Sequence, residues 1–353
     1  MKLKIFVSSL LLIVLVIAII LLLKKEDSNS QLKPHFPSSD DDYYQADSLT
    51  GHFHKKNVTR EFAWKEHPDG KIVMKTNNAG LRNDSDSKVQ KDKNQFRVII
   101  TGDSHIDGVL NNSQSVAFFL EEGLNNQYPE RQNEVLNAGN GYYGPQNYLG
   151  VYHKFQSYKP DMFIVTIYTG NDFLDAIRIE AENNSLTVPD RPKGYYDKLW
   201  EIDGLYTGFT GQQLNQLKFF NTFPSYTDTA LLITEKNLLK IKNLCRQNHT
   251  TFLVVLLPTK IDTEPQTDQS RINEVFEMMN FNESHLQKNR EMVIALTQWL
   301  EQNSINFTDL YEIYSQSNKE LYWKADYHAN IDGHEIMANK ILNTKIINDK
   351  LTN

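Results

Sequence analysis

The stretch FRVIITGDSHIDG, residues 96–108, decides the fold class. A run of apolar, mostly β-branched residues ends abruptly in Gly-Asp-Ser, and a helix-like segment follows a few residues later. This is how a buried parallel strand delivers a side chain to the carboxyl edge of an open α/β sheet, where ligands bind. The side chain delivered here is Ser104, whose hydroxyl becomes a nucleophile only where another group takes its proton.

A candidate for that group lies far downstream, in the sequence DYHANIDGH at residues 326–334. It places His328 two residues after Asp326 and just before a predicted terminal helix. A serine, a histidine and an aspartate in this relationship are the parts of a nucleophilic hydrolase or acyltransferase. The sequence therefore predicts that Ser104, His328 and Asp326 meet at the edge of the sheet.

Strand and helix patterns alternate along most of the chain. Strands are predicted at 96–101, 134–137, 162–168, 251–257 and 305–310, and helices at 113–126, 146–157, 289–303 and 333–346. The run 162–168 is almost entirely apolar, as expected of a central strand that is buried on both faces. The alternation predicts an α/β fold, a three-layer α/β/α sandwich around a parallel sheet.

Residues from about 175 to 240 interrupt this alternation and are rich in aromatic side chains. One interpretation is an insertion over the active edge, as a lid or a substrate platform. The other is that the aromatic residues only form a small core of their own. The pattern does not distinguish the two.

The beginning of the chain predicts a membrane anchor. Residues 5–23 are apolar apart from two serines, and lysines flank both ends. About 19 residues at a rise of 1.5 Å nearly cross a bilayer. No Ala-x-Ala-like cleavage site follows, so an uncleaved signal anchor within residues 1–25 is favoured over a signal peptide. We expect a short cytoplasmic amino terminus, a linker and N-terminal extension over 26–70, and an extracytoplasmic domain over 71–350.

Composition excludes several other classes of protein. The net charge is −7, and the basic patch that nucleic-acid binding needs is absent from the sequence. The single cysteine, Cys245, cannot form a disulfide within the chain, and no cysteine and histidine residues have zinc-ligand spacing. No cofactor and no metal are expected.

Four segments together resemble the SGNH/GDSL hydrolase family, whose blocks centre on Ser, Gly, Asn and His in this order. In this chain the blocks are Ser104 in GDS, Gly141 in NAGNGYYGPQNY at 137–148, Asn171 in GND at 170–172, and His328. The sequence TNNAGLR at 76–82 also resembles a strand and turn found upstream in many bacterial members. The likeness covers about residues 96–346, without the aromatic insertion.

The resemblance implies a role for each block. Ser104 would attack an ester carbonyl, His328 would take the proton of its hydroxyl, and Asp326 would fix the imidazole tautomer. The backbone N–H groups of Ser104 and Gly141 and the side-chain amide of Asn171 would form the oxyanion hole.

Other assignments remain open in the sequence. Ser104 could simply cap the following helix. Gly139 could take the place of Gly141, and Asp332 could take that of Asp326. Three further polar residues are expected to support the local structure rather than to react: Asp103, His105 and His334.

The expected activity is that of a membrane-anchored serine esterase that hydrolyses O-acyl esters, with acylated glycans of the cell envelope as substrate. Three alternatives stay open. An acyltransferase would pass the same acyl group to a sugar hydroxyl. A lipase or thioesterase would bind acyl chains with the aromatic insertion. A non-catalytic envelope protein would only bind glycans. The sequence does not predict an oligomeric state.

Overall fold

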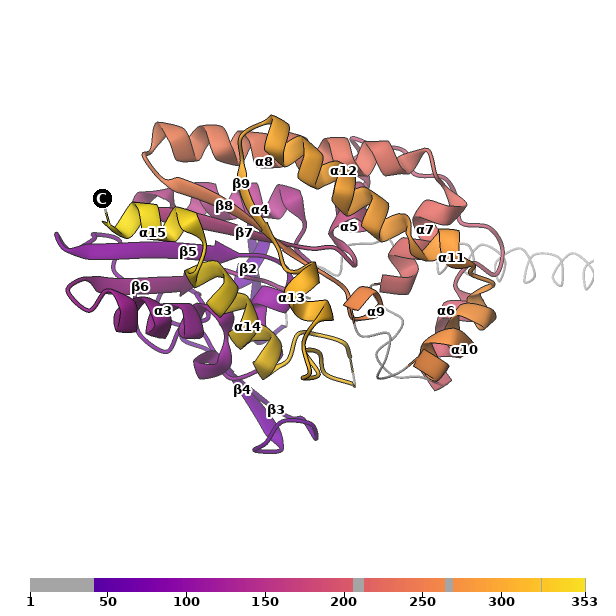
Figure 1. The fold of residues 1–353 in the computed structure, drawn as a ribbon, viewed down its shortest axis with the longest axis horizontal. Coiled ribbons are helices and arrows are strands. Elements are labelled where there is room, and N and C mark those ends of the chain that lie inside the picture. The colour runs from indigo at the N-terminus through magenta and orange to yellow at the C-terminus, as the bar shows by residue number, and fades with distance from the viewer. Residues whose placement is uncertain (1–40, 206–212, 264–268, 325, 353) are drawn as a thin grey trace, which may run out of the picture.

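A parallel sheet of five strands forms the centre of the protein (Figure 1). A computed structural model describes residues 41–352, apart from 206–212, 264–268 and 325. The strands are β5 (Gln95–Thr101), β6 (Gln132–Asn137), β7 (Met162–Tyr168), β8 (Thr251–Leu257) and β9 (Asn306–Asp309). Their order is β6-β5-β7-β8-β9, so the first strand lies between the second and the third. This is a doubly wound arrangement, and it confirms the predicted α/β class.

The strands alternate their apolar side chains between the two faces of the sheet. In β7, Phe163 and Val165 join one core cluster, whereas Met162 and Ile164 join the other. All seven residues of β7 are buried, as predicted for a central strand. The predicted bounds of β7 and β8 agree with the structure residue for residue.

Helices cover both faces of the sheet, which gives the predicted three layers (Figure 1). One layer holds α4 (Pro145–Phe155), α5 (Asp172–Glu182), α8 (Tyr226–Gln247) and α12 (Lys288–Gln302). The other holds α3 (Val116–Gln127), α14 (Ile331–Leu342) and α15 (Lys345–Thr352). The sequence predicted a single terminal helix over 333–346, but α14 ends at Leu342 and a second helix follows.

The predicted insertion over 175–240 is narrower in the structure. Its two ends fall within α5 and α8, which are covering helices of the sheet. A second excursion that the sequence did not indicate follows β8, and its helix α10 contacts α6. The shorter helices are α2 (Ser104–Asp107), α6 (Asp197–Leu205), α7 (Asn215–Thr222), α9 (Lys260–Thr263), α10 (Gln269–Met279), α11 (Glu283–Leu286) and α13 (Tyr311–Ser315), with 3-10 turns at Asn112–Gln114 and Gln156–Tyr158.

The aromatic residues of the insertion fall into different environments. Phe219 and Phe220 are buried in the main core, on the α8 side of the sheet. Tyr195 belongs to a separate small cluster with Leu199 and Ile202. Tyr196 instead lines the cavity described below. The small core of the second interpretation is therefore present, whereas Phe219 and Phe220 fit neither interpretation because they pack in the main core.

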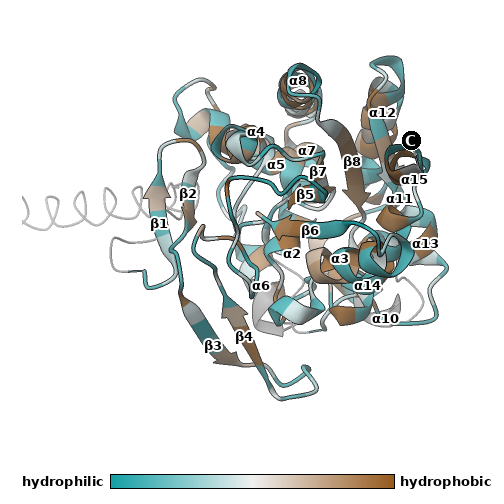
Figure 2. Ribbon diagram, turned by 90° about the vertical axis from the view of Figure 1, so that its left-hand side faces the viewer, coloured by the Kyte–Doolittle hydropathy of each residue, from teal (hydrophilic) through white to brown (hydrophobic). Residues whose placement is uncertain are grey.

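The N-terminal extension is folded from residue 41 onward, where the sequence suggested a linker. Two antiparallel hairpins lie beside the main sheet, and the second projects away from it (Figure 2). The strands are β1 (Tyr44–Asp47), β2 (Gly51–His54), β3 (Thr59–Ala63) and β4 (Lys71–Lys75). The linker and extension predicted over 26–70 gave no indication of β1, β2 and β3, because burial of polar residues such as His52 and His54 has no signature in composition.

The first hairpin is tied to helix α4. Lys154 forms an ion pair with Asp47, and the side-chain amide of Asn147 donates to the carbonyl oxygen of Thr50 at 2.9 Å. Gly150 lets the two backbones approach, because a Cβ atom there would lie 2.1 Å from the carbonyl oxygen of Leu49.

Within the described residues, no helix is both long and apolar enough to cross a membrane. The signal anchor predicted for residues 1–25 lies outside the described part of the chain.

Gly150→Ala tests the docking of the hairpin on α4. The new methyl group meets a backbone carbonyl that cannot turn aside, so we expect a loss of about 1–3 kcal/mol in the free energy of unfolding. Gly123→Ala in α3 is the matched control, because its new methyl would meet only the flexible end of Leu342. The control should stay within about 1 kcal/mol of the parent, helped by the higher helix propensity of alanine. Equal stabilities of the two variants in urea unfolding would contradict this docking.

Candidate active site

A tight turn after β5 places Ser104 at the carboxyl edge of the sheet. Gly102 is required there, since a Cβ atom would lie 2.5 Å from a side-chain carbon of Ile106. The carboxylate of Asp103 then caps α2 by accepting a hydrogen bond of 2.9 Å from the N–H of His105. Ser104 is therefore the first residue of α2 and does not cap it, so its hydroxyl is available to other partners.

A second turn folds Asp326 back onto His328. Tyr327 between them has a φ of 58°, a left-handed conformation that is uncommon for a residue with a side chain. One carboxylate oxygen of Asp326 accepts from the backbone N–H of His328 at 3.1 Å, and the other accepts from Nδ1 at 2.8 Å. The opposite ring nitrogen, Nε2, lies 2.8 Å from Oγ of Ser104. The structure thus brings together the three residues that the sequence singled out.

Hydrogen bonds and ring contacts fix the loop that carries His328. His105 Nδ1 accepts a hydrogen bond of 3.2 Å from the N–H of Ala329. The His105 ring is stacked on Tyr168 at 3.7 Å and lies 4.8 Å from the ring of His328. On the other side, the N–H of Trp323 donates to the carbonyl oxygen of His328 at 2.8 Å. His105 therefore positions this loop, in the supporting role that the sequence suggested.

The remaining candidates lie away from the reacting atoms. Asp332 forms an ion pair with Lys319 on the surface, so it does not replace Asp326. His334 is buried, and its Nδ1 accepts a hydrogen bond of 3.0 Å from the N–H of Val116. Both residues lie in α14, away from Ser104 and His328.

The charges of the Asp326–His328 pair reinforce each other. Burial alone would lower the pKa of His328, but the adjacent carboxylate of Asp326 outweighs it and holds this pKa above the usual 6.5. Conversely, and against the effect of burial, His328 keeps the pKa of Asp326 below its usual value. Asp326 is therefore ionised at neutral pH and stabilises a proton on the imidazole.

Ser104, Gly141 and Asn171 line one cavity of about 550 Å³, together with His328. Gly139 does not line this cavity; a Cβ atom on it would lie 2.4 Å from the backbone nitrogen of Asp107. Of the two glycines that the sequence left open, Gly141 lines the cavity and Gly139 does not. Asn171 reaches the cavity because it directly precedes α5 at the end of β7.

Two buried carboxyl groups lie beneath the cavity. Burial raises the pKa of Asp103 to about 7, and a hydrogen bond from the side chain of Asn171 partly opposes that effect. Burial also raises the pKa of Asp172 well above its usual value, although its two oxygens contact the hydroxyl of Tyr148 at 2.9 and 2.8 Å. Burial therefore favours the neutral form of Asp172, the residue directly after Asn171.

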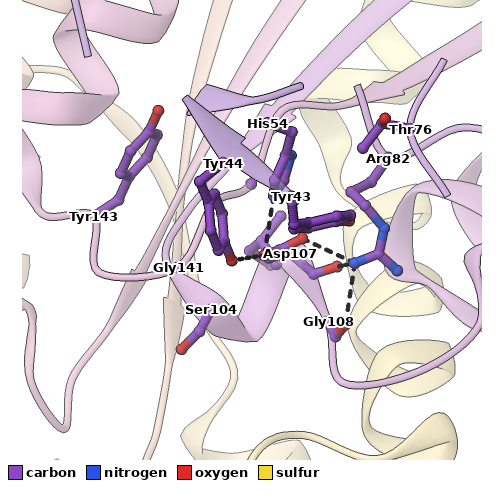
Figure 3. A network of polar contacts seen from close by, with 12 residues as sticks. Tyr43, Tyr44, His54, Thr76, Arg82, Ser104, Asp107, Gly108, Gly141 and Tyr143 are labelled. Atoms are coloured by element: carbon purple, nitrogen blue, oxygen red, sulfur yellow. Dashed lines mark hydrogen bonds and ion pairs between the residues drawn. The ribbon is translucent and has the colours of Figure 1, made fainter. Parts of the chain in front are cut away.

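A third carboxylate, Asp107, is held ionised by a buried cluster (Figure 3). Its oxygens contact Nη1 of Arg82 at 2.8 Å, Nε2 of His54 at 3.2 Å and the hydroxyl of Tyr44 at 3.2 Å. Although burial opposes ionisation, His54 and Arg82 lower the pKa of Asp107 to about 2. Figure 3 shows the hydroxyl of Tyr44 directed toward the region between Asp107 and Gly141.

The N-terminal hairpins therefore contribute to the site, which the sequence analysis missed. His52 donates from Nε2 to the carbonyl oxygen of Gly141 at 2.8 Å and so fixes that loop. Tyr44 lines the cavity beside Ser104. The one available signal was the segment 76–82, whose Arg82 holds Asp107. Nothing in the spacing of residues connected that arginine to positions 44, 52 and 54.

Among the residues that the structure describes, no three His, Cys, Asp or Glu side chains are grouped as metal ligands.

No family model and no curated protein matches the chain. Among solved structures it is similar to LAE5, an alpha/beta hydrolase enzyme from the metagenome of Lake Arreo (14% identity, TM-score 0.38, 70% of this chain and 93% of that one). It is also similar to a catalytic mutant of the acetylxylan esterase Axe2 from Geobacillus stearothermophilus (14%, 0.39, 72% and 94%). A GDSL-like lipase from Bacteroides thetaiotaomicron is a further neighbour (15%, 0.38, 74% and 91%). A resemblance in fold at such identities does not establish function.

The titration of His328 tests the electrostatics of the pair. We expect its imidazole to titrate above pH 6.5 in NMR spectra of the parent. In Asp326→Asn the midpoint should fall by about one pH unit or more, because burial then acts without the carboxylate. His334, whose pKa burial lowers to about 3, is an internal control and should not titrate between pH 5 and 8 in either protein. The same His328 midpoint in both proteins would show that Asp326 does not act on it.

Proposed function

We propose that the protein is a serine ester hydrolase of the SGNH/GDSL type. One observation carries this proposal: Asp326, His328 and Ser104 form a continuous series of contacts of 2.8 Å that ends on the floor of a cavity. In this arrangement a base lies within hydrogen-bond distance of a nucleophile, and a carboxylate orients the base.

In the first step, Oγ of Ser104 attacks the carbonyl carbon of an ester while its proton passes to Nε2 of His328. The backbone N–H groups of Ser104 and Gly141 and the amide of Asn171 stabilise the resulting oxyanion. The tetrahedral intermediate then collapses, the bond to the alcohol breaks, and the alcohol leaves with the proton from His328. The product is an acyl group on Ser104.

In the second step, water replaces the alcohol. His328 takes one proton from the water molecule, and the hydroxide formed attacks the acyl carbon. The bond to Oγ breaks, Ser104 recovers its proton from His328, and a carboxylic acid is released. Asp326 stays ionised throughout and stabilises the imidazolium in both steps.

Short O-acyl groups on a carbohydrate are the substrate that we infer for this cavity. Its volume of about 550 Å³ accommodates more than a small acyl group. Phe62, Trp64 and Tyr196 line it, and aromatic rings of this kind offer flat apolar surfaces to the faces of sugar rings.

We also propose that residues 1–25 anchor the enzyme to a membrane and leave its catalytic domain outside the cytoplasm. The apolar run 5–23 and its flanking lysines support this. In a bacterial host, the full chain should stay in the membrane pellet after carbonate extraction, whereas a variant that lacks residues 1–30 should be released. Protease added to intact spheroplasts should digest the domain. Full release of the full chain, or complete protection from the protease, would contradict this localisation.

Ester hydrolysis is tested with p-nitrophenyl acetate and the Ser104→Ala variant. Loss of the nucleophile should lower kcat by at least about 10⁴-fold, because His328 and Asp326 then have nothing to activate. Ser157→Ala, on the exposed turn after α4, is the matched control and should keep the parental rate. A fluorophosphonate should add one adduct to the parent, on Ser104, and none to Ser104→Ala.

Two results would contradict hydrolysis. Equal rates in the parent and Ser104→Ala would remove the serine from the reaction. A burst of one equivalent of nitrophenolate without turnover would instead indicate an acyltransferase, in which the acyl group awaits a hydroxyl acceptor.

A further inference from the structure

One wall of the cavity is a strand from the second hairpin. Arg60, Phe62 and Trp64 alternate along β3 and its end, so they share one face of the hairpin. Met74 of β4 is the direct partner of Arg60 and lies on the same face. All four side chains line the cavity that holds Ser104. The hairpin thus presents an aromatic surface with a guanidinium group at one end.

Another part of the lining comes from α5 and the segment after it. It includes Arg178, Arg191 and Tyr196. Arg191 stacks its guanidinium group over the ring of Phe219 at 4.5 Å, which fixes the position of this cation without neutralising it.

Most of the charges in the cavity are neutralised by near neighbours. Asp107 is paired with Arg82 at 2.8 Å, and Asp175 with Arg178 at 2.7 Å. The carboxylate of Asp326 contacts His328. These groups therefore leave little net charge to act on a ligand.

Arg60 and Arg191 are the exceptions among the charged residues that line the cavity. No carboxylate in the described part of the chain lies within 4 Å of either guanidinium group. Arg60 is exposed on its strand, lies 5.8 Å from the ring centroid of Tyr43, and helps to lower the pKa of Asp41 without a direct ion pair. Arg191 donates only to the carbonyl oxygen of Pro189 at 3.1 Å in the described contacts. The lining of the cavity therefore holds two such cations, one on β3 and one after α5.

We propose that the alcohol part of the substrate is an anionic saccharide, whose carboxylate groups are bound by Arg60 and Arg191 while its sugar rings lie against Phe62 and Trp64. This inference rests on the proposed esterase function and specifies its substrate. A guanidinium group is suited to a carboxylate because its planar donors match the two oxygens.

The spacing of residues along β3 indicates that the alcohol part of the ester, and not its acyl part, lies against this surface. Residues on one face of a strand are about 7 Å apart, so the surface from Arg60 to Trp64 extends over roughly 13 Å. An acetyl group at Ser104 is far too short to follow such a surface, whereas two or three linked sugars are not.

The overall charge of the protein makes local cations necessary for such a substrate. The chain carries a net charge of −7 and therefore repels a polyanion at long range. Binding of an acidic saccharide then requires positive groups within the site, and these two arginines supply them at short range, where salt screens less.

The experiment compares two acetylated polymers, polygalacturonate with its carboxylates and neutral xylan. We expect the parent to release acetate from acetylated polygalacturonate with the higher kcat/KM. In Arg60→Gln the ratio of the two kcat/KM values should fall about three- to tenfold, through a higher KM for the anionic polymer. Arg60→Lys should keep part of the preference, because it keeps the charge. Arg246→Gln, which removes an exposed arginine at the end of α8, is the matched control and should leave the ratio unchanged.

An equal or higher kcat/KM on neutral xylan in the parent would overturn the inference. So would an unchanged ratio in Arg60→Gln.

Binding of non-acetylated oligogalacturonate separates this inference from the esterase function, because it needs no catalysis. We expect the parent to bind oligogalacturonate, to do so more weakly at higher NaCl concentration, and to bind xylo-oligosaccharides less tightly. If p-nitrophenyl acetate is not hydrolysed but this binding holds and weakens in Arg60→Gln, the esterase function fails and anion recognition stands. If the ester is hydrolysed but oligogalacturonate does not bind, the inference fails and the esterase function stands.

Discussion

The contact between Nε2 of His328 and Oγ of Ser104 is the interaction on which the rest of the site depends. It joins residues that are 224 positions apart in the chain. It therefore forms only when strand β5 and the loop before α14 are both in place. Each partner is fixed from its own side. Asp103 caps the helix that Ser104 begins, and the left-handed residue Tyr327 lets Asp326 reach back to the imidazole. His105, directly after the serine, then holds the histidine loop through Ala329. The hydrogen bonds that stabilise these two turns are therefore also the ones that bring Ser104 and His328 together.

The site also depends on the segments before the main sheet, because they supply the partners of the buried carboxylate of Asp107. An isolated carboxylate at the position of Asp107 would be costly, because burial disfavours the ionised form. Arg82 and His54 compensate, and they come from the segments before the main sheet. Removal of either partner would leave only the other to compensate the charge of Asp107 beside the cavity. This explains why a hairpin outside the sheet is packed so closely on α4, with Gly150 allowing the backbones to approach. The hairpin thus packs as one unit with the domain that holds the candidate site.

The parts that the sequence predicted well are those set by local patterns. Apolar runs such as 162–168 and 251–257 identify buried parallel strands by themselves, and short polar blocks at the ends of such strands must meet at one edge. Ser104 was singled out in this way, whereas the roles of Gly141 and Asn171 were implied by the resemblance to a family, and His328 was singled out by its spacing from Asp326 before a predicted helix. The hairpin residues Tyr44, His52 and Arg60 were not, because their importance depends on long-range contacts and on which charges stay unpaired. The insertion predicted over 175–240 was too long for a related reason. Aromatic composition does not reveal that Phe219 belongs to the main core while Tyr196 faces a cavity.

The residues at the strand ends were easier to predict than the residues of the cavity surface, because their geometry is more tightly constrained. The nucleophile and its base need fixed geometry within a few tenths of an ångström, which rigid strand ends and capped turns provide. Substrate recognition needs only a surface of suitable shape and charge above that centre. In this protein the surface comes from the segments that leave the sheet, β3 on one side and the chain after α5 on the other. Such segments can change sequence without disturbing the strands, so one catalytic centre can serve different esters. The two arginines that have no carboxylate within 4 Å in the described part of the chain lie on those segments and line the cavity. In the function proposed above, the choice of substrate therefore depends on these segments, and the reaction depends on the groups at the ends of the sheet strands.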